Sequence, residues 1–310
     1  MLKYLVILLS DDCASFCRYE NAGKTNRLIP IDVLKKGIIF GMKENLMIQF
    51  ALPDYQLPSD YSDAINSIDH TIIGTSCCLE VADIVILNGW DFDTSTLDAQ
   101  KYYVLRTRFE DFVANYTMIP QMLVGIKRLN LIITDIQTLV LSTAESQYKR
   151  IIDFLVTEIA CLFKSGISPE LNILTDRLQL SRMNNCGAGE EVLTLAPDGK
   201  FYICPAFYYG NSSPVGDAQK GVAIPNKQLY KLDHAPICRR CDAYHCQRCI
   251  WLNKTMTLEC NTPSHEQCVL THIERDGSAR LRKILSEEGF KNLAPLDECN
   301  YLDPFDLIVQ

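Results

Sequence analysis

The sequence predicts an α/β protein, a partial (β/α)6 TIM-like barrel followed by a small domain rich in cysteine. Apolar runs of strand length alternate with helical patterns through the first part of the chain. After residue 180 the helical patterns fade, turns take over and cysteines concentrate. Near-continuous apolar strands that alternate with helices are typical of a parallel sheet covered by helices. We therefore expect two domains, at residues 1–180 and 181–310.

The elements of the first domain follow one another in strand–helix order. We expect strands at 2–10, 46–52, 82–89, 101–108, 128–136 and 171–178, and helices at 32–45, 59–68, 109–123 and 142–166. About six strand–helix units suit a partial barrel, and a doubly wound sheet is the rival arrangement.

The helix at 142–166 has the clearest pattern. Its apolar residues recur at helical spacing and form one stripe: Ile151, Ile152, Leu155, Val156, Ile159, Leu162 and Phe163. Gly166 stands where a glycine commonly ends a helix. This helix is expected to cover one face of the sheet.

The second domain is expected to fold around turns and metal. The stretch "EVLTLAPDGKFYIC", residues 191–204, is typical of a hairpin built about a Pro-Asp-Gly turn. A segment with few long apolar elements and many cysteines usually depends on metal for its folding energy.

Composition and charge exclude several classes of protein. The chain has 310 residues, 47% of them hydrophobic, with a formal charge of −8. Nucleic-acid binding needs clustered Lys and Arg, so this acidic balance argues against it. No apolar run reaches the ~20 residues that span a bilayer, and the opening run lacks the features of a signal peptide. We expect a cytoplasmic protein with no membrane or nucleic-acid partner.

The cysteines point to metal. In the reducing cytosol, the 14 cysteines favour metal binding over disulfides. Eight of them form a spaced set in the second domain: Cys186, Cys204, Cys238, Cys241, Cys246, Cys249, Cys260 and Cys268. Two C-x2-C pairs lie four residues apart within it, and thiolates at that spacing can face one metal or cluster. A zinc site is an alternative, to which His245 or His265 could add a nitrogen ligand, although each is more simply a core or surface histidine.

The order C-x12-G-x4-C, gap, C-x2-C-x4-C-x2-C, gap, C resembles the SPASM domain of radical SAM peptide-modifying enzymes. This resemblance implies that Cys186, Cys204 and Cys249 ligate a first auxiliary 4Fe–4S cluster, with Cys260 as the candidate fourth ligand. It implies that Cys238, Cys241, Cys246 and Cys268 ligate a second. Both central gaps are one residue shorter than in the family pattern. The division of cysteines between the clusters therefore stays open, as do a single cluster and zinc.

The loop after the first strand resembles a radical SAM loop that has lost one ligand. In that family the loop carries C-x3-C-x2-C, whereas here Cys13 and Cys17 are followed by Glu20. Three thiolates are needed to leave one iron open for S-adenosylmethionine, and a carboxylate is a harder donor for iron. After the second strand, "IQFALPDYQLP" also lacks the Gly-Gly-Glu-Pro-like segment that holds the cofactor's amino group. We expect this degenerate loop to be empty of a cluster and S-adenosylmethionine not to bind.

More narrowly, the chain resembles the CXXX-repeat peptide maturase family. The matching stretches are "FCRYEN", "LKKGIIFGMKENLMIQF" and "CNTPSHEQCVLTHIERDGSARL". This resemblance implies an accessory, pseudo-radical-SAM subunit that forms a heterodimer with an intact radical SAM maturase. It would bind a cysteine-rich precursor peptide for modification, plausibly thioether formation. The alternatives are a self-sufficient iron–sulfur enzyme with Glu20 as a ligand, and a zinc- or cluster-stabilised binding module without a catalytic role.

Overall fold

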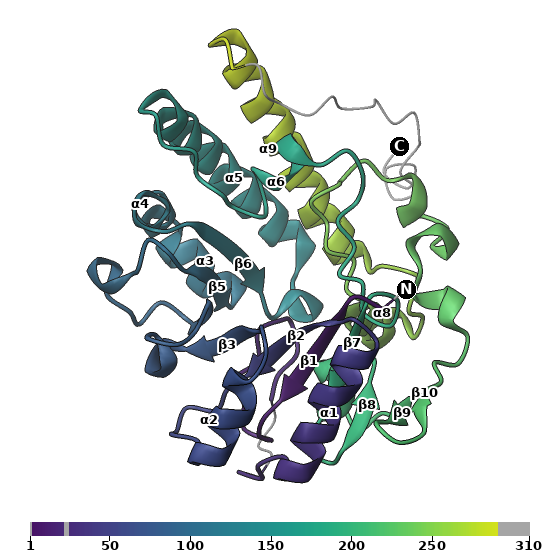
Figure 1. Ribbon diagram of the computed structural model, residues 1–310. Coiled ribbons are helices and arrows are strands. Elements are labelled where there is room, and N and C mark those ends of the chain that lie inside the picture. The colour runs from purple at the N-terminus through teal and green to yellow at the C-terminus, as the bar shows by residue number, and fades with distance from the viewer. Residues whose placement is uncertain (1, 22–24, 291–310) are drawn as a thin grey trace. The chain divides into compact units, whose positions relative to one another are not determined.

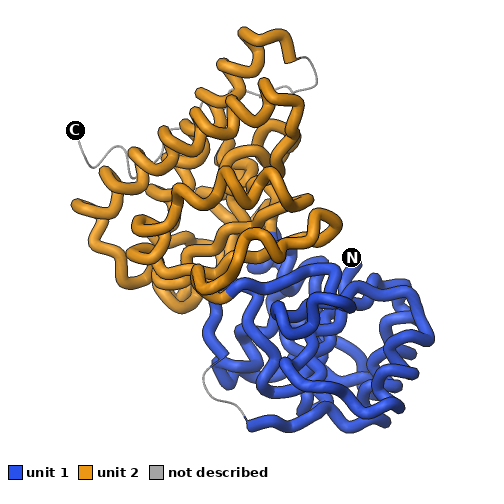
Figure 2. The backbone as a smooth tube through the Cα atoms, turned by 90° about the vertical axis from the view of Figure 1, so that its left-hand side faces the viewer, with its two compact units in different colours: residues 1–87, 186–231 blue, residues 88–185, 232–310 orange. Residues whose placement is uncertain are grey.

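A computed structural model describes residues 2–21 and 25–290 of the chain (Figure 1). These residues form two compact units, each made of two separate segments (Figure 2). Unit 1 comprises residues 1–87 and 186–231, and unit 2 comprises residues 88–185 and 232–310. The sequence-based division at residue 180 follows the cysteine content and remains a prediction. The units alternate along the chain because a strand from beyond residue 186 joins the first sheet.

Unit 1 is built on one sheet whose central strand is β1. Its strands are β1 (Tyr4–Leu8), β2 (Met47–Ala51), β3 (Thr71–Thr75), β4 (Ile84–Asn88), β7 (Val192–Leu195), β8 (Lys200–Tyr202), β9 (Gly216–Asp217) and β10 (Gly221–Val222). β1 pairs in parallel with both β2 and β7, and β2, β3 and β4 continue in parallel. β7, β8, β9 and β10 pair in antiparallel fashion, which makes β10 an edge strand of this sheet.

The helices of unit 1 are α1 (Ile31–Lys43), α2 (Ser59–Asn66) and α7 (Pro205–Tyr209). α1 packs closely on the sheet because it carries glycine where it touches the strands. A Cβ on Gly37 would lie 2.2 Å from Leu195 Cδ2 and 3.6 Å from Ile7 Cδ1. A larger residue at Gly37 would require the Leu195 side chain to move or the helix to shift from the strands.

Unit 2 contains two parallel strands, β5 (Tyr102–Thr107) and β6 (Arg128–Ile133), and most of the helices. Its helices are α3 (Phe109–Asn115), α4 (Ile119–Gly125), α5 (Leu141–Lys164), α6 (Asp176–Gln179), α8 (Ile250–Thr257) and α9 (His265–Glu287). The long helices α5 and α9 lie side by side (Figure 1). Gly277 permits this approach, because a Cβ there would lie 2.4 Å from Ile152 Cγ2.

The predicted fold class is confirmed: parallel strands alternate with helices, and a turn-rich segment with many cysteines follows. The hairpin about Pro-Asp-Gly is confirmed as β7 and β8. Gly166 follows the end of α5 with a φ of +82°, as expected of a glycine that ends a helix. Within the described residues, no helix combines the length and the apolar character that a membrane crossing requires.

Three details differ from the prediction. The strand expected at 171–178 is wrong, because Leu171 makes only one bridge and the chain then turns into α6. The Thr175 hydroxyl stabilises that turn by accepting a hydrogen bond from the Leu171 N–H. The helix expected at 109–123 is interrupted between α3 and α4 by a short 3-10 turn, and Pro120 lies in the first turn of the new helix. β3 was not predicted, and it contains Gly74, a residue type that is uncommon inside strands.

Candidate metal centre

Three of the four cysteines predicted for the second cluster lie together in unit 2. Cys238 begins a short 3-10 turn, Cys238–Arg240, and Cys241 directly follows it. The Cys241 N–H donates to the Cys238 carbonyl at 3.1 Å, which is the tight turn expected of C-x2-C. Cys238 is buried beside Met183 and Ala235, and the partly buried Cys241 and Cys246 pack against the same group of side chains. The three cysteines whose spacing in the sequence suggested a shared site therefore do lie close together in the structure.

The fourth predicted ligand, Cys268, lies in the first turn of α9. Ser264 caps this helix by accepting a hydrogen bond from the Gln267 N–H at 3.2 Å. Gln267 Nε2 lies 4.0 Å from Cys246 Sγ, and His272 Nε2 lies 3.8 Å from Cys241 Sγ. Because Cys268 and His272 are four residues apart, they share one face of the helix. The start of α9 thus borders the cysteine cluster.

A pair of arginines holds the loop between Cys241 and Cys246. Buried Arg177 donates to the Asp242 carbonyl at 2.9 Å and to its carboxylate at 3.0 Å. Arg275 of α9 reaches the second carboxylate oxygen at 3.4 Å. A carboxylate held from two sides by guanidinium groups fixes the backbone next to it. The loop that carries the thiols is therefore anchored to α6 and α9.

The charges around the cysteines fit an anionic, thiolate-bound group. Burial raises the pKa of Cys238 to about 11, and the positive charge of Arg248 opposes that shift. Arg248 also opposes the raised pKa of Cys260, and it is completely buried. A cation inside the protein offsets part of the charge that several thiolates would bring together. The residue types gathered here, several thiols beside a buried cation, are those that a cluster or a thiolate-bound metal would require.

The structure as described does not bring a full ligand set into contact. Over residues 2–21 and 25–290, no three His, Cys, Asp or Glu side chains lie close enough to hold one metal ion. Of the set predicted for the first cluster, Cys186 and Cys204 belong to unit 1, and Cys249 and Cys260 to unit 2. The assignment of the eight cysteines to clusters remains a prediction.

The two histidines weighed as ligands occupy different settings. His245 is buried, and its Nε2 lies 3.1 Å from Glu274 of α9. Glu274 also accepts a hydrogen bond from the buried Tyr148 hydroxyl of α5. His265, the first residue of α9, is exposed. His245 thus belongs to a buried polar network that joins the cysteine loop to both long helices.

Sequence reasoning missed the residues around the thiols, namely Gln267, His272, Asp242, Arg177 and Arg248. Asp242 and Arg248 had an accessible signal, because both stand inside "CRRCDAYHCQRC", and so did Gln267, which directly precedes the predicted ligand Cys268. The others come from segments that fold back onto this loop, which no local pattern reveals.

The opening loop of unit 1 has a different character. Cys13 is completely buried, and its thiol donates to the Ala51 carbonyl at 3.0 Å while its sulfur accepts the Ser10 N–H at 3.3 Å. Cys17 is half-buried and Glu20 is exposed. The donor set expected for a radical SAM cluster, three thiolates facing one space, is therefore not what this loop offers. The residues present do not fit that group.

Aromatic side chains from α7 pack against the same loop. Tyr209 stacks on buried Tyr19 with 5.4 Å between ring centroids, and its hydroxyl reaches the Cys13 carbonyl at 3.5 Å. Tyr208 donates to the Asp11 carboxylate, which also pairs with Arg27 at 3.4 Å. Burial of these side chains stabilises the loop in its present conformation.

The buried thiol of Cys13 predicts a dependence of stability on pH. Burial raises the pKa of Cys13 from 9.0 to about 12. The folded state therefore retains this proton to higher pH than the unfolded state does. The stability that results is complete below pH 9.0 and is lost as the pH rises toward about 12.

Urea unfolding at a series of pH values checks this expectation. The free energy of unfolding of the unaltered chain should fall more steeply above pH 9.0 than that of a Cys13→Ala variant. Tyrosines far from this loop contribute equally to both proteins, so the difference reports on Cys13 together with Tyr209 and Tyr55, whose pKa values are raised by burial and also by the Cys13 thiolate. Parallel curves would show that Cys13 is not a protonated, buried thiol.

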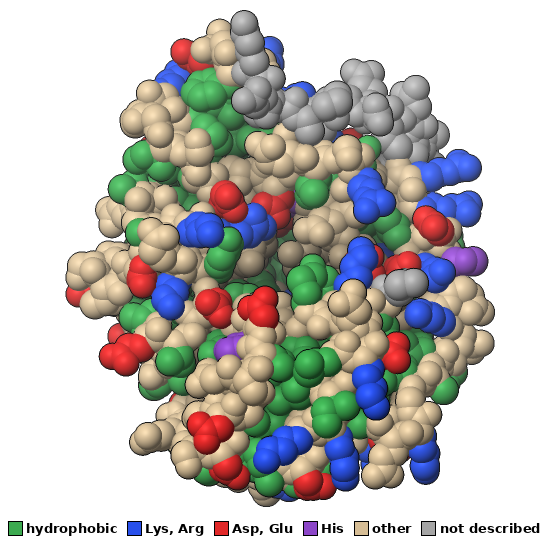
Figure 3. Space-filling model, viewed as in Figure 1, with side chains coloured by type: hydrophobic (Ala, Val, Ile, Leu, Met, Phe, Trp, Pro, Cys, Tyr) green, Lys and Arg blue, Asp and Glu red, His purple; other side chains and the backbone are tan. Residues whose placement is uncertain are grey.

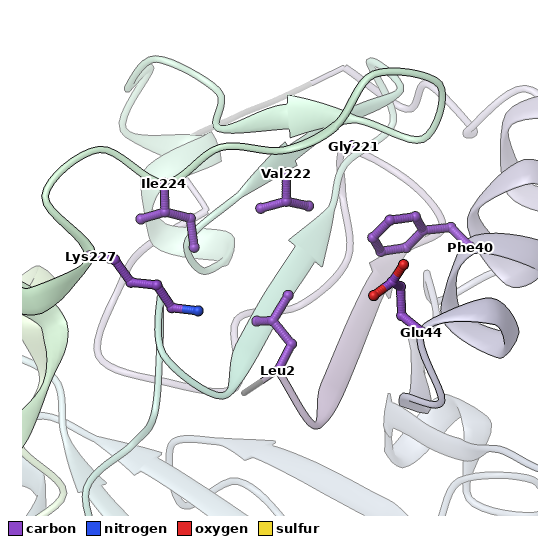
Figure 4. Close-up of a pocket in the computed structure, with 7 residues that line it drawn as sticks. All are labelled: Leu2, Phe40, Glu44, Gly221, Val222, Ile224 and Lys227. Atoms are coloured by element: carbon purple, nitrogen blue, oxygen red, sulfur yellow. The ribbon is translucent and has the colours of Figure 1, made fainter.

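A pocket of about 300 Å³ lies in unit 1 next to the edge strand β10. Leu2, Phe40, Val222 and Ile224 give it an apolar lining, with Glu44 and Lys227 on opposite sides (Figure 4), and Gly221 completes the wall. Hydrophobic side chains also gather on the surface where α1 lies (Figure 3). Two residues of α1, Ile39 and Met42, are exposed. This part of unit 1 combines an apolar surface, two opposite charges and the edge of a sheet.

Comparison with solved structures gives the same fold. The protein anSMEcpe with bound AdoMet and Cp18Cys peptide matches with a TM-score of 0.64 and 12% identity, over 92% of this chain and 99% of that one. His-tagged anSMEcpe with bound AdoMet gives 0.61 and 10%, over 93% and 100%. Streptococcus suis SuiB bound to S-adenosylmethionine gives 0.50 and 10%, over 86% and 75%. No protein-family model and no curated protein matches.

These likenesses show that the chain has a radical SAM/SPASM-like fold. At such low identity they establish the architecture alone. Whether the chain retains the chemistry of its neighbours depends on the residues at the opening loop and in the cysteine cluster.

Proposed function

We propose that this protein is an accessory, pseudo-radical-SAM subunit of a peptide-modifying system. It pairs with a catalytically intact radical SAM enzyme as a heterodimer and presents a cysteine-rich precursor peptide of the CXXX-repeat type for modification, plausibly thioether formation. One observation carries the proposal. The Cys13 thiol, which would be a cluster ligand in an active enzyme, is buried and donates to the Ala51 carbonyl.

The neighbouring contacts support the same conclusion. Tyr209 packs on Tyr19 and reaches the Cys13 carbonyl, while Glu20 faces solvent. A cluster at this loop would require Cys13 to give up both of its hydrogen bonds and Glu20 to turn inward. Such a rearrangement would break hydrogen bonds between buried groups, which costs free energy. S-adenosylmethionine then has no open iron to bind.

The cysteine-rich segment has a separate role in this proposal. Cys238, Cys241, Cys246 and Cys268 hold one auxiliary 4Fe–4S cluster, and Cys186, Cys204, Cys249 and Cys260 are assigned to another. Such a group supplies one-electron redox capacity or structural stability when bound. The chain's own residues bind it through thiolates, offset its charge with Arg248, and fix the loop through Asp242.

A peptide partner is supported by the surface of unit 1. An extended peptide can add to the edge strand β10, and an apolar side chain of that peptide can enter the adjoining pocket (Figure 4). Glu44 and Lys227 favour a peptide that carries a basic residue on one side of the apolar one and an acidic residue on the other. The neighbour anSMEcpe was solved with a bound peptide.

Co-purification with a candidate radical SAM partner tests the proposal. The two chains should elute together, and the partner should modify its peptide faster when this chain is present. This chain alone should not cleave S-adenosylmethionine. A Glu20→Cys variant tests whether the loop is a relic of a cluster site. Cleavage of S-adenosylmethionine by the unaltered chain without a partner would overturn the assignment.

Two other functions remain distinguishable by metal content. About twelve irons per chain would support a self-sufficient enzyme whose opening loop holds a third cluster, and about eight would support two auxiliary clusters. Zinc without sulfide would support a binding module without a redox role.

A further inference from the structure

We propose that the end of α8 from a second copy of this chain docks in the pocket beside β10, with Leu258 as the side chain that enters it. We call this end of α8, residues 254–260, the α8 tip. The contact joins two copies and occupies the surface at which a precursor peptide is proposed to bind. Competition with the peptide rests on the proposed function, whereas the contact between copies does not.

Leu258 ends α8 in a backbone conformation that leucine rarely adopts. Its φ is +63°, in the left-handed region where glycine is the usual residue at a helix end. Its side chain is 84% exposed, so the strained backbone is not compensated by burial of this leucine in its own chain. Backbone strain of this kind is concentrated at functional sites. An exposed leucine held in this way is available to pack on another molecule.

Hydrogen bonds on both sides of Leu258 fix the α8 tip. The Thr257 hydroxyl accepts a hydrogen bond from the Glu259 N–H at 3.3 Å. The completely buried Asn253 donates from its side-chain amide to the Cys260 carbonyl at 3.0 Å. A segment that is already ordered loses little conformational entropy when it binds. The tip is therefore a preformed binding element.

The pocket suits an apolar side chain. It has a volume of about 300 Å³, and Leu2, Phe40, Val222 and Ile224 give it an apolar lining (Figure 4). A leucine side chain from another molecule would exchange water contact for this lining. Burial of one leucine favours association by about tenfold or more.

The charges around the pocket are complementary to those of the α8 tip. Glu44 and Lys227 lie on opposite sides of the pocket (Figure 4). In the tip, Lys254 lies one helical turn before Leu258, and Glu259 directly follows it. In the docked arrangement Lys254 faces Glu44 and Glu259 faces Lys227, so each charge meets its opposite. This complementarity identifies a second copy of the chain as the occupant.

The tip also has the side chains that the proposed function assigns to the peptide, namely a basic, an apolar and an acidic residue. A peptide and the tip of a second copy therefore compete for one pocket. Because a single leucine and two charge pairs bury less surface than a stable interface needs, the contact is weak and a peptide can displace it. Self-association thus keeps the pocket covered until a peptide arrives.

Sedimentation velocity of the full chain over a range of concentrations tests the contact. The unaltered chain should sediment faster as its concentration rises. Leu258→Gly should lower the association constant by about tenfold or more, and glycine suits the backbone conformation at this position. Val124→Ser changes another exposed apolar residue of unit 2 and should leave the association unchanged.

Variants of the two surfaces test which groups meet. Lys227→Glu places a carboxylate opposite Glu259 and should weaken association, and Glu259→Lys in the same chain should restore it. An equimolar mixture of Leu258→Gly and Lys227→Glu chains has an intact pocket on one chain and an intact tip on the other. That mixture should form a 1:1 dimer at concentrations where each variant alone is monomeric.

The possible failures are distinguishable. An unaltered chain that stays monomeric, or a Leu258→Gly chain that associates equally well, would overturn the inference. Failure of the mixed variants to form a dimer would also overturn it. A synthetic peptide that carries a leucine between a lysine and a glutamate should shift the unaltered chain toward monomer. Self-association that this peptide does not affect would overturn the competition and the proposed peptide site, and would leave the contact between copies standing.

Discussion

Replacing Cys238 and Cys241 together by serine is expected to remove about four irons and four sulfides per chain. The two thiols flank one tight turn and pack in one group of side chains with Cys246. Their loss therefore leaves too few thiolates to hold a 4Fe–4S cluster. Because a cluster contributes to the folding energy of its domain, the variant should also unfold at lower urea concentration. Iron and sulfide assays after anaerobic reconstitution measure the first effect.

Cys161→Ser provides the matched control. Cys161 is exposed on α5 and belongs to no cysteine pair, so its replacement should leave the iron content unchanged. Equal iron in the Cys238→Ser/Cys241→Ser variant and in the control would show that this turn is not a cluster site. Loss of zinc in place of iron would support the zinc-stabilised binding module.

Asp242→Ala is expected to lower the free energy of unfolding by about 3–5 kcal/mol. Arg177 is buried, and burial lowers its pKa while the charge of Asp242 acts in the opposite direction. Removing Asp242 leaves a guanidinium in the interior without its carboxylate and frees the loop that carries the thiols. Urea unfolding of the two proteins under the same conditions measures the difference.

An exposed ion pair of unit 2 gives the comparison for this variant. Asp153 pairs with Arg280 between α5 and α9, and both side chains are largely exposed. Asp153→Ala should therefore cost less than about 1 kcal/mol. If Asp242→Ala costs no more than Asp153→Ala, the clamp does not anchor the cysteine loop.

The fold was predictable where the sequence has a clear local pattern, such as apolar residues that recur at a regular spacing. The apolar stripe of the helix at 142–166 corresponds to α5, and the Pro-Asp-Gly turn corresponds to the β7–β8 hairpin. The prediction failed at 171–178, where a strand-like composition is overridden by the hydrogen bond between Leu171 and Thr175. A short element has too few residues for the spacing of its apolar side chains to distinguish a strand from a turn.

The candidate site was predictable in its thiols and not in their surroundings. Cysteine spacing alone predicts that Cys238, Cys241 and Cys246 lie together, as they do. Gln267 and His272 of α9, which lie beside Cys246 and Cys241, were missed because neither has a spacing signal relative to the loop. Nor could the burial of Cys13 be predicted, because the C-x3-C spacing says nothing of whether a thiol points at a cluster or at a carbonyl.

The iron content of a Cys13→Ser/Cys17→Ser variant tests the central claim most directly. The claim is that the cysteine-rich segment binds clusters and the opening loop binds none. Anaerobically reconstituted variant and unaltered chain should therefore contain equal iron, about eight atoms for two clusters. A variant that lacks about four of the irons found in the unaltered chain would contradict the claim, because those irons would belong to the opening loop.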